Sequence, residues 1–537
     1  MADILLPPWI HCARARMRYR DNTGLSRGEY TGQVLTADKG GDKLEASIEF
    51  TPAGGSSAQT AMERAALIAF LARLRGRRNR PYLFDVANRL RGSFPAAELL
   101  TNNTLESGTT GWSSSSVNVS ISVSDRTLRA VRSDVTSGIH TVRPPAFTVS
   151  DAYSPHVFRV FLMLGRGVIN SRLVLGTSAG NNDIATGSVF AAQGLQSLVG
   201  VHPSGGNNAS VYDIATGRIP GDYYEISYAS VSRCLLVDNG ANTLLQSDEF
   251  DTTWAATRSS VDDQAGVAPD GASTADSIIE DSSASTTHYV QQNVTIPSAV
   301  NDYAFAVTLK SGARNFAQLS LIEGTGSESA VAYFDIATGV VGDTGVGTNW
   351  ANIRASVVAL GNGWYYCCIV ARKTNSATVL SARLSISSTA ATGGVTYTGN
   401  GTSNILAWRA TLAQSSVPTR LIATTTTAST GTSQTGSALH VKGLPVSANG
   451  LLLPNDQFEV ITSRGSELKI VTSALNSDAA GLGYLQFEPP LRGAPADNAP
   501  IILHQPMGRF IFTGEFPEWS TEPGFITTAS AEFEEAA

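Results

Sequence analysis

The stretch Asp335-Ile336-Ala337-Thr338-Gly339 occurs three times in the chain, because the same five residue types recur at 183–187 and 213–217. The aspartate of such a stretch can accept a hydrogen bond from the backbone two residues on, and the glycine can adopt a positive φ. Each copy therefore predicts a tight turn. Gly, Ser, Thr and Asn dominate the surrounding residues, and this composition favours short strands over long helices.

Two longer units of similar order surround these turns. A Leu-Leu pair leads to Trp112 in the first unit and to Trp254 in the second, and each unit ends on an apolar, strand-like run. A repeat of this length predicts two similar supersecondary units. We therefore expect two β-sandwiches in tandem, at residues 97–240 and 241–423.

The block before the sandwiches, residues 1–96, contains the one convincing helix of the sequence. Ser56 can cap its start, with Gln59 three residues on, and Gly76 is a natural stop. The apolar stripe at helical spacing consists of Leu67, Phe70, Leu71 and Leu74. Residues 43–50 alternate between apolar and polar types, which predicts a strand with one buried face for the helix to cover.

The two end blocks, 1–96 and 424–537, each lack what a stable domain needs. The first has too few strands to close a sheet, and the second, which opens on a low-complexity linker, has strands but no covering helix. One discontinuous domain explains both blocks, since a domain with close termini tolerates an insertion. The predicted fold is mainly β: a discontinuous β-barrel or β-sandwich domain with one helix, interrupted by two tandem sandwiches.

Charge and cysteine content limit the possible partners. The net charge is −7, which gives no general attraction to nucleic acid, and specific nucleic-acid binding is not expected. Residues 1–95 hold 15 Lys and Arg against 9 acidic residues, so the remainder carries about −13. Four scattered cysteines suit synthesis in a reducing cytosol. Neither a signal peptide nor a run long enough for membrane insertion is expected.

No catalytic motif stands out, and neither an enzymatic activity nor a cofactor is expected. A glycosidase needs two converging carboxylates, and the acidic pairs 262–263 and 280–281 more often occur as solvated side chains. Sugar binding needs exposed aromatic rings beside polar groups. The candidates are Trp254, Tyr289, Trp350, Trp364 and Tyr397. We expect Trp254 and Trp364 to fill the core instead, whereas Trp350 lies in a polar stretch and is expected to be exposed.

Two further groups of charged residues allow both a functional and a purely structural interpretation. Asp270, Asp276 and Asp335 could contribute oxygen ligands to calcium, although such residues more often make Asx turns, and no metal is expected. A basic run follows the helix and consists of Arg73, Arg75, Arg77, Arg78 and Arg80. It could complement the helix dipole or form ion pairs between subunits, and contact with DNA is the weakest alternative.

Short motifs in the end blocks carry a family resemblance. The N-terminal motifs are Trp9, Arg18, Gly32-Gln33, the helix end at 70–76 and Asn79. The C-terminal motifs are Gly443-Leu444-Pro445, Asn455-Asp456, the Ser-Asp-Ala-Ala-Gly run at 477–481, the Pro-Pro-Leu-Arg run at 489–492 and Phe533-Glu534. Together these blocks resemble siphophage tail-tip proteins of the distal-tail type. The resemblance implies a homo-oligomer, a hexameric ring, that contacts other tail proteins such as the tail tube and the hub.

The second sandwich carries a resemblance of its own, over nearly its whole length. Its motifs are Asn242, Leu244-Leu245, Ser247, Phe250, Trp254, the Ala-Pro-Asp-Gly run at 268–271, Thr274-Ala275-Asp276, the Gly-Asn-Gly-Trp run at 361–364 and the Gly-Asn-Gly-Thr run at 399–402. They resemble the jelly-roll modules of phage tail and fibre proteins that are described as carbohydrate-binding. The first sandwich lacks the runs found at 268–271 and 361–364.

These observations predict a structural subunit of a tailed-phage baseplate or tail tip, located in the virion. The split domain would form the ring, and the two sandwiches would project outward and adhere to host-surface glycans. Two alternatives stay open: a fibre-type receptor-binding protein without a ring, and a glycan-degrading tail enzyme.

Overall fold

The fold is mainly β, as predicted, and contains several sheets. The computed structural model of the chain describes residues 3–6, 10, 12–20, 23–27, 34–38, 43–50, 57–74, 79–84, 90–114, 119–124, 126–133, 140–166, 171–178, 182–189, 193–202, 205–213, 221–324, 329–514, 518–522 and 526–536. Within these ranges α1 (Ser57–Leu74) is the only α-helix. No helix in the described part combines the length and apolar character needed to cross a membrane.

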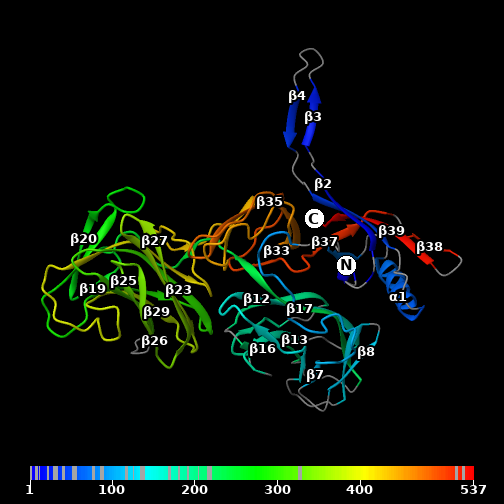
Figure 1. The fold of residues 1–537 in the computed structure, drawn as a ribbon, viewed down its shortest axis with the longest axis horizontal. Helices are drawn as coiled ribbons and strands as arrows, with labels where there is room; N and C mark the ends of the chain where they lie inside the picture. Colours follow the sequence, from blue (N-terminus) through cyan, green and yellow to red (C-terminus); the bar gives the residue numbers. More distant parts are fainter. Residues whose placement is uncertain are drawn as a thin grey trace.

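Strands from both ends of the chain form one sheet, with α1 beside it (Figure 1). Its order is β1 (Asp3–Leu5), β6 (Arg80–Leu83), β37 (Gly508–Phe512), β39 (Ile526–Glu535), β5 (Lys43–Phe50) and β2 (Cys12–Arg20), and β38 (Glu518–Glu522) pairs with β39. The N- and C-termini therefore lie close together. A separate hairpin, β3 (Thr23–Arg27) and β4 (Val34–Asp38), projects away from the body (Figure 1).

The helix packs as its sequence pattern predicts. Its stripe of Leu67, Phe70, Leu71 and Leu74 is buried. The alternate residues of β5, from Leu44 to Phe50, are buried in the same core. The rings of Phe50 and Phe70 lie 6.4 Å apart. Burial of this apolar stripe, rather than helix propensity, is what stabilises a helix of this length.

The C-terminal block contributes to two cores, where the sequence predicted one domain. Its last strands, β37 and β39, complete the sheet beside α1. Its earlier strands instead extend a sheet of the first sandwich and enclose a separate core that includes Leu235 and Val237. These strands are β32 (Gly436–Lys442), β33 (Gln457–Thr462), β34 (Gly465–Val471), β35 (Leu482–Leu491) and β36 (Pro500–Ile502).

The first sandwich consists of two facing sheets around a common core. One sheet contains β7 (Ser113–Ser114), β10 (His140–Arg143), β11 (Phe147–Val149), β13 (Ser171–Gly176), β14 (Ala185–Thr186) and β16 (Gly205–Asp213). The other contains β8 (Val119–Ser124), β9 (Thr127–Arg132), β12 (Pro155–Arg166), β15 (Gly194–Val201) and β17 (Tyr223–Val237). The long strand β17 continues past the sandwich and pairs with β32 and β36, so this sandwich is continuous with the body.

The second sandwich has two six-stranded antiparallel sheets, which we name by their central strands. The β29 sheet has the order β19 (Ala255–Thr257), β22 (Tyr289–Thr295), β29 (Val379–Ser387), β24 (Phe316–Glu323), β25 (Ser329–Asp335) and β26 (Val340–Val346). The β30 sheet has the order β20 (Ser259–Gly266), β21 (Ala275–Glu280), β30 (Asn404–Gln414), β23 (Asn301–Ser311), β28 (Trp364–Lys373) and β27 (Trp350–Gly361). Their inward side chains form the largest apolar core described.

The second sandwich joins the body through a short two-strand ladder. In this ladder β18 (Ala241–Asn242) pairs with β31 (Ser429–Thr430), so the two ends of the insertion lie side by side. The β30 sheet then turns its outer face toward the body. Tyr366 and Cys368 on that face belong to an apolar cluster that Ala480 of the C-terminal block also contacts.

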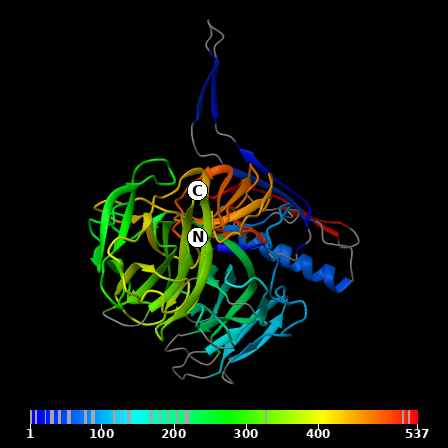
Figure 2. The same cartoon turned by 60° about the vertical axis from the view of Figure 1, so that its left-hand side comes forward.

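Two arginines of the β30 sheet add contacts with the first sandwich. The guanidinium carbon of Arg354 lies 4.7 Å from the centre of the Tyr153 ring, and Arg372 Nη1 donates a hydrogen bond of 2.5 Å to the Asp183 carbonyl. The β30 sheet is therefore the docking side of the second sandwich, which stands beside the rest of the molecule in Figures 1 and 2.

The turn predicted at 335–339 is confirmed. Asp335 Oδ1 accepts hydrogen bonds of 3.0 and 3.1 Å from the backbone N–H groups of Ala337 and Thr338. Gly339 has a φ of 73°. The turn predicted at 183–187 is wrong, because Asp183 accepts from the backbone and hydroxyl of Thr177 and residues 185–186 form the strand β14. The third copy lies outside the described residues after its Asp213.

Candidate functional site

The outer face of the β29 sheet is polar, in contrast to the docked face of the β30 sheet. Strand residues alternate between the two faces of a sheet. Along β22, β29, β24 and β25, the residues that enter the apolar core are Val290, Leu380, Ala382, Leu384, Ile386, Ala317, Leu319, Leu321, Ala330, Ala332 and Phe334. Their neighbours in sequence therefore point outward.

The strand register arranges these outward side chains in three rows. The first row is Tyr289, Ser385, Gln318 and Tyr333. The second row is Gln291, Arg383, Ser320 and Val331. The third row is Asn293, Ser381, Ile322 and Ser329. We call these twelve residues, all of them described, the row face. Hydroxyl and amide groups dominate it. Six of its residues are buried, namely Gln318, Ser320, Ile322, Tyr333, Ser381 and Ser385. The six that are partly or fully exposed are Tyr289, Gln291, Asn293, Ser329, Val331 and Arg383.

Arg383 stands at the centre of the row face. Its Nε and Nη2 donate hydrogen bonds of 3.0 and 2.8 Å to Oε1 of Gln291. Its guanidinium carbon lies 3.9 Å from the centre of the Tyr289 ring, a cation–π contact. Burial lowers the pKa of Arg383. Tyr289, a predicted binding residue, therefore contacts Arg383 with one face of its ring. Only the opposite face of the ring is free of Arg383.

Hydrogen bonds fix several neighbouring polar groups of the row face. Ser381 donates to Asn293 Oδ1 at 2.5 Å, and Ser320 donates to Gln318 Oε1 at 2.9 Å. At the far corner, the hydroxyl of Tyr333 accepts from the backbone N–H of Gly393 at 3.3 Å. Tyr333 is buried, so it closes one end of the row face and does not offer a ring to solvent.

A hollow of about 580 Å³ adjoins the opposite end of the row face. It opens where β19 stops and leaves the edge of β22 unpaired. Its lining residues are Thr243, Leu245, Thr253, Ala255, Gln291, Gln292, Asn293, Val294, Thr295 and Ala428. Gln291 both lines this hollow and bonds to Arg383, so the hollow and the row face share polar groups.

The expectation that Trp350 is exposed is wrong. Its side chain is 4% exposed and belongs to the main core of the second sandwich. It begins β27 opposite Lys373, and this pairing turns the ring inward. The burial expected for Trp254 and Trp364 is confirmed. Trp254 fills the main core, whereas Trp364 lies in a smaller cluster with Ala268 and Trp408.

Tyr397 takes part in a polar network inside the sandwich. Its hydroxyl donates to Glu280 Oε2 at 2.7 Å, and Arg314 pairs with the same carboxylate at 2.7 and 2.8 Å. Burial alone would raise the pKa of Glu280. The hydrogen bonds from Arg314, Tyr397 and the Asn400 backbone outweigh burial, so the pKa of Glu280 lies below its ordinary value. A carboxylate held ionised in this way does not suit the general-acid role of a glycosidase.

The three aspartates considered for calcium do not come together. Asp335 makes the turn described above, and Asp270 accepts from the backbone of Ala272 in another Asx turn. Asp276 instead lies with Asp251 and Asp263, whose carboxylate oxygens are all within 4.8 Å. Asp276 already accepts from two backbone N–H groups, and burial raises its pKa to about 6. These bonds tie β21 to Phe250 and to β20.

Only two arginines of the predicted basic run lie in the described part of the chain. Arg73 is exposed at the end of α1, and its Nη1 lies 3.4 Å from Met163 Sδ. Arg80 begins β6 and is partly buried. Arg75, Arg77 and Arg78 lie outside the described residues. The role of this run in subunit contacts stays a prediction.

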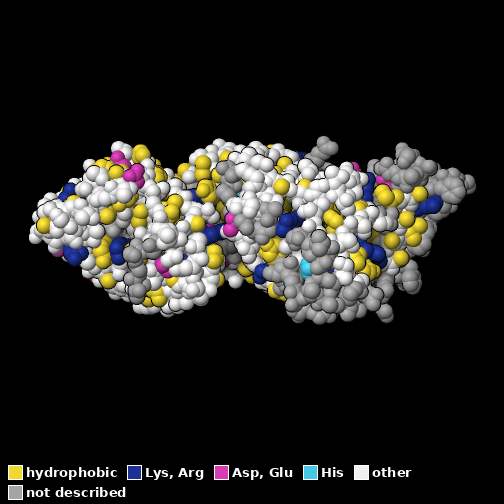
Figure 3. Space-filling model, turned by 90° about the horizontal axis from the view of Figure 1, so that it is seen from below, with side chains coloured by type: hydrophobic (Ala, Val, Ile, Leu, Met, Phe, Trp, Pro, Cys, Tyr) yellow, Lys and Arg dark blue, Asp and Glu magenta, His cyan; other side chains and the backbone are white. Residues whose placement is uncertain are grey.

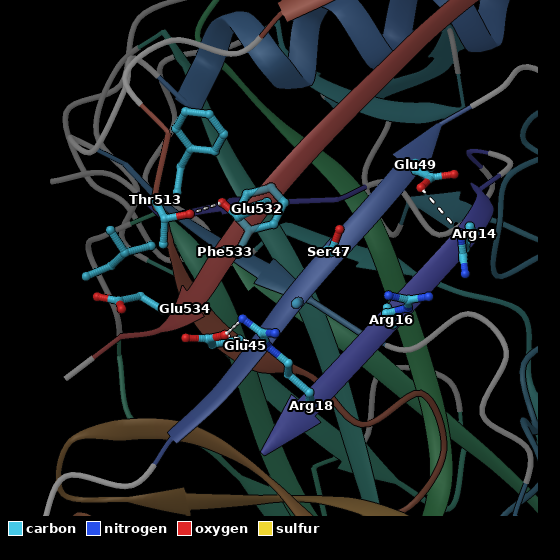
Figure 4. Close-up of a pocket in the computed structure, with 13 residues that line it drawn as sticks. Arg14, Arg16, Arg18, Glu45, Ser47, Glu49, Thr513, Glu532, Phe533 and Glu534 are labelled. Carbon is cyan, nitrogen blue, oxygen red and sulfur yellow. Dashed lines mark hydrogen bonds and ion pairs between the residues drawn. The ribbon is translucent and has the colours of Figure 1, made fainter. Parts of the chain in front are cut away.

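A charged face that sequence reasoning missed lies on the sheet of the end blocks. Figure 4 shows Arg14, Arg16 and Arg18 along β2, beside Glu45 and Glu49 of β5. Arg18 bonds to Glu45 at 2.6 Å, and Arg14 lies 3.9 Å from Glu49. These side chains line a hollow of about 510 Å³ together with Glu532 and Glu534 of β39. The alternation of arginine at 14, 16 and 18 was the available signal.

Most of the surface seen in Figure 3 is neither apolar nor charged, and charged side chains are scattered over it. This distribution follows from the low content of charged residues in the chain. The charged face on β2, β5 and β39, where three arginines and four glutamates lie together, contrasts with this scatter.

Comparisons with known proteins give only distant likenesses. No family model matches the chain, and no curated protein matches it. The N-terminal tandem of two CBM22 domains of Xyn10C from Paenibacillus barcinonensis is 13% identical, covers 60% of this chain and 99% of its own, and has a TM-score of 0.20. The tandem CBM51 modules of the family 98 glycoside hydrolase Sp3GH98 from Streptococcus pneumoniae are 10% identical to this chain. The match covers 74% of this chain and 100% of theirs, with a TM-score of 0.16. Likenesses at this level establish neither a shared fold nor a shared ligand.

Proposed function

We propose that the second sandwich binds carbohydrate on its row face and that the chain is a structural subunit of a phage tail tip. The observation that carries the binding role is the row face itself. It holds amide, hydroxyl and guanidinium groups at regular spacing on the side turned away from the docked β30 sheet. Sugar hydroxyls require such donors and acceptors, together with an apolar surface for the sugar ring.

The proposed role as a ring subunit has separate support. Strands from both ends of the chain share one sheet, so the sandwiches leave the end domain as insertions. The motifs that resemble distal-tail proteins lie in the same end blocks. A ring of such subunits would present several row faces together, and weak sites gain avidity from copy number.

The proposed function involves no turnover. Of the two acidic pairs considered for a glycosidase, Glu280 is fixed by Arg314 and Tyr397, and Asp281 bonds to the backbone and hydroxyl of Ser283. Asp262 and Asp263 are exposed on β20, in the other sheet from the row face. A depolymerisation assay on host polysaccharide should show no new reducing ends. The appearance of new reducing ends would support the alternative of a glycan-degrading tail enzyme.

The test of carbohydrate binding uses the full-length protein on extracted host-surface polysaccharides. Gln291→Ala and Asn293→Ala should each weaken binding by roughly two- to tenfold, because each removes a hydrogen-bonding amide. Tyr289→Ala should weaken it as well, while Tyr484→Ala, which removes an exposed tyrosine from the C-terminal block, should not. Equal binding by all variants would exclude the row face as the site.

The oligomer is tested independently by negative-stain microscopy of the same preparation. A closed ring supports the tail-tip role, whereas an elongated trimer supports the alternative of a fibre-type receptor-binding protein.

A further inference from the structure

Arg383 is a partly buried cation without a charged partner. In the part of the chain that the structure describes, no carboxylate forms an ion pair with it, and its hydrogen bonds go to the neutral amide of Gln291. In the three rows of the row face, all described, Arg383 is the only charged side chain. Arg314 and Arg409 of the same sandwich each pair with a carboxylate. Arg354, which like Arg383 forms no ion pair in the described part of the chain, instead bonds to the Ser416 carbonyl and stacks on the Tyr153 ring.

An uncompensated guanidinium in this position is costly unless something offsets its charge. Partial burial removes part of its hydration, and a neutral amide returns less than a carboxylate does. The downward shift in the pKa of Arg383 has burial as its main cause. The Tyr289 ring and Gln291 hold the guanidinium in one orientation, which reduces the entropy lost when a ligand binds.

Arg383 is partly exposed and keeps donors beyond those bonded to Gln291. A guanidinium has five N–H donors, and the bonds to Gln291 use two of them. Its cross-strand neighbours on β24 and β22 are Ser320 and Gln291, so a short hydroxyl side chain borders it on one side. Because Gln291 occupies the Nε–Nη2 edge, a planar acid group can approach the Nη1–Nη2 edge of Arg383 and be met there by two parallel hydrogen bonds.

We infer that the saccharide recognised by the row face carries an acidic group and that Arg383 binds this group. This inference rests on the proposed carbohydrate-binding function and specifies the chemical class of its ligand. The acid could be the carboxylate of a uronic or sialic acid or a phosphate or sulfate substituent, because all of these accept two hydrogen bonds from a guanidinium. Sugar hydroxyls would meet the amides of Gln291, which is partly exposed, and Asn293, which is exposed.

The test compares each polysaccharide with a form that differs only in charge. Polygalacturonate, alginate, hyaluronan and polysialic acid are offered to the full-length protein beside their carboxyl-reduced forms, together with a phosphorylated and a sulfated glycan and their dephosphorylated and desulfated counterparts. The acidic form of at least one pair should bind roughly ten- to hundredfold more tightly, as expected for a charge-assisted bond. This preference should fall as salt rises, because salt screens the charge.

The variants separate this inference from the proposed function. Arg383→Gln should abolish the preference and keep the weak binding to neutral forms, Arg383→Lys should keep part of it, and Arg464→Gln, which removes an exposed arginine from the C-terminal block, should change nothing. Thermal unfolding of each variant checks that it folds. Equal binding of charged and neutral forms by the wild type would overturn the inference and leave carbohydrate binding intact. Binding to no glycan would overturn both.

Discussion

Trp350 contributes its indole to the core of the second sandwich, so its replacement should affect stability. Trp350→Ala removes a large buried side chain and should lower the free energy of unfolding by about 3–5 kcal/mol. Tyr289→Ala, at the outer face, should cost far less and should reduce glycan binding. Chemical denaturation should show the loss of stability in Trp350→Ala, and glycan-binding measurements should show the loss of binding in Tyr289→Ala. A Trp350→Ala variant of normal stability would contradict the burial of this ring.

Two histidines of the first sandwich should make its stability sensitive to acid. His156 and His202 are buried with their rings 5.5 Å apart. Burial lowers the pKa of each to about 4, from an ordinary value of 6.5. Both are therefore neutral in the folded protein, while the unfolded chain takes up protons once the pH falls below about 6.5. Their contribution to stability is complete above that pH and is lost progressively toward pH 4.

Thermal unfolding at a series of pH values measures this effect. The melting temperature of the wild type should fall between pH 6.5 and 4.5, and His156→Gln combined with His202→Gln should flatten the dependence. Carboxylates also titrate in this range. The contribution of the two histidines is therefore the difference in pH dependence between the wild type and the double variant. Identical slopes would show that the two imidazoles are not the source.

At single positions, the sequence predicts burial only where a regular pattern surrounds the residue. Trp254 follows a repeated apolar pattern, and its burial was predicted. Trp350 follows a Gly-Thr-Asn stretch, and its burial arises from pairing with β28, which no local pattern shows. Arg383 lies in an alternating strand that would place it on a polar face, but the absence of a carboxylate nearby depends on residues about 60 to 90 positions away.

At the scale of elements, local periodicity predicted α1 and β5, because both bury one face and repeat at a fixed spacing. The dual role of β17 was not predictable in this way. Its residues 223–233 pair within the first sandwich, and residues 234–237 pair with β32 and β36. The apolar character of the strand is the same in both parts, so the sequence does not show where its partners change.

This role of β17 changes which deletion should leave a folded protein. Removal of residues 243–428, with Asn242 joined to Ser429 by a short Gly/Ser turn, should leave a cooperative β-rich protein, because these two residues are paired. Removal of 98–423 also removes Leu235 and Val237 from a core and uncovers β32 and β36. That shorter chain should unfold at a lower temperature or aggregate. Circular dichroism and calorimetry would compare the stability of the two deletion variants. A more stable 98–423 deletion would refute the role of β17.

At the scale of the whole molecule, the charged face on β2, β5 and β39 is the described surface best suited to contact another copy. Its arginines lie on the edge strand β2, and its glutamates lie on β5 beside it and on β39 beyond. In the proposed ring, Arg14→Glu combined with Arg16→Glu and Arg18→Glu should weaken assembly and leave the subunit folded. Three changes are needed because one exposed ion pair is worth only about 0–1 kcal/mol.

Analytical ultracentrifugation measures this effect on assembly. The triple variant should sediment as smaller species than the wild type, and the same number of charge reversals at Arg126, Arg129 and Arg464, which lie outside this face, should leave sedimentation unchanged. An unaltered oligomer would assign the charged face to another partner or to solvent.

The two-rung pairing of Ala241 with Thr430 and of Asn242 with Ser429 has an evolutionary consequence. Everything between these rungs enters and leaves the molecule at one point, so recombination could exchange the whole sandwich without altering the register of the sheets beneath. Under the proposed function, a lineage could then acquire a new host range in one genetic event and inherit its assembly machinery unchanged.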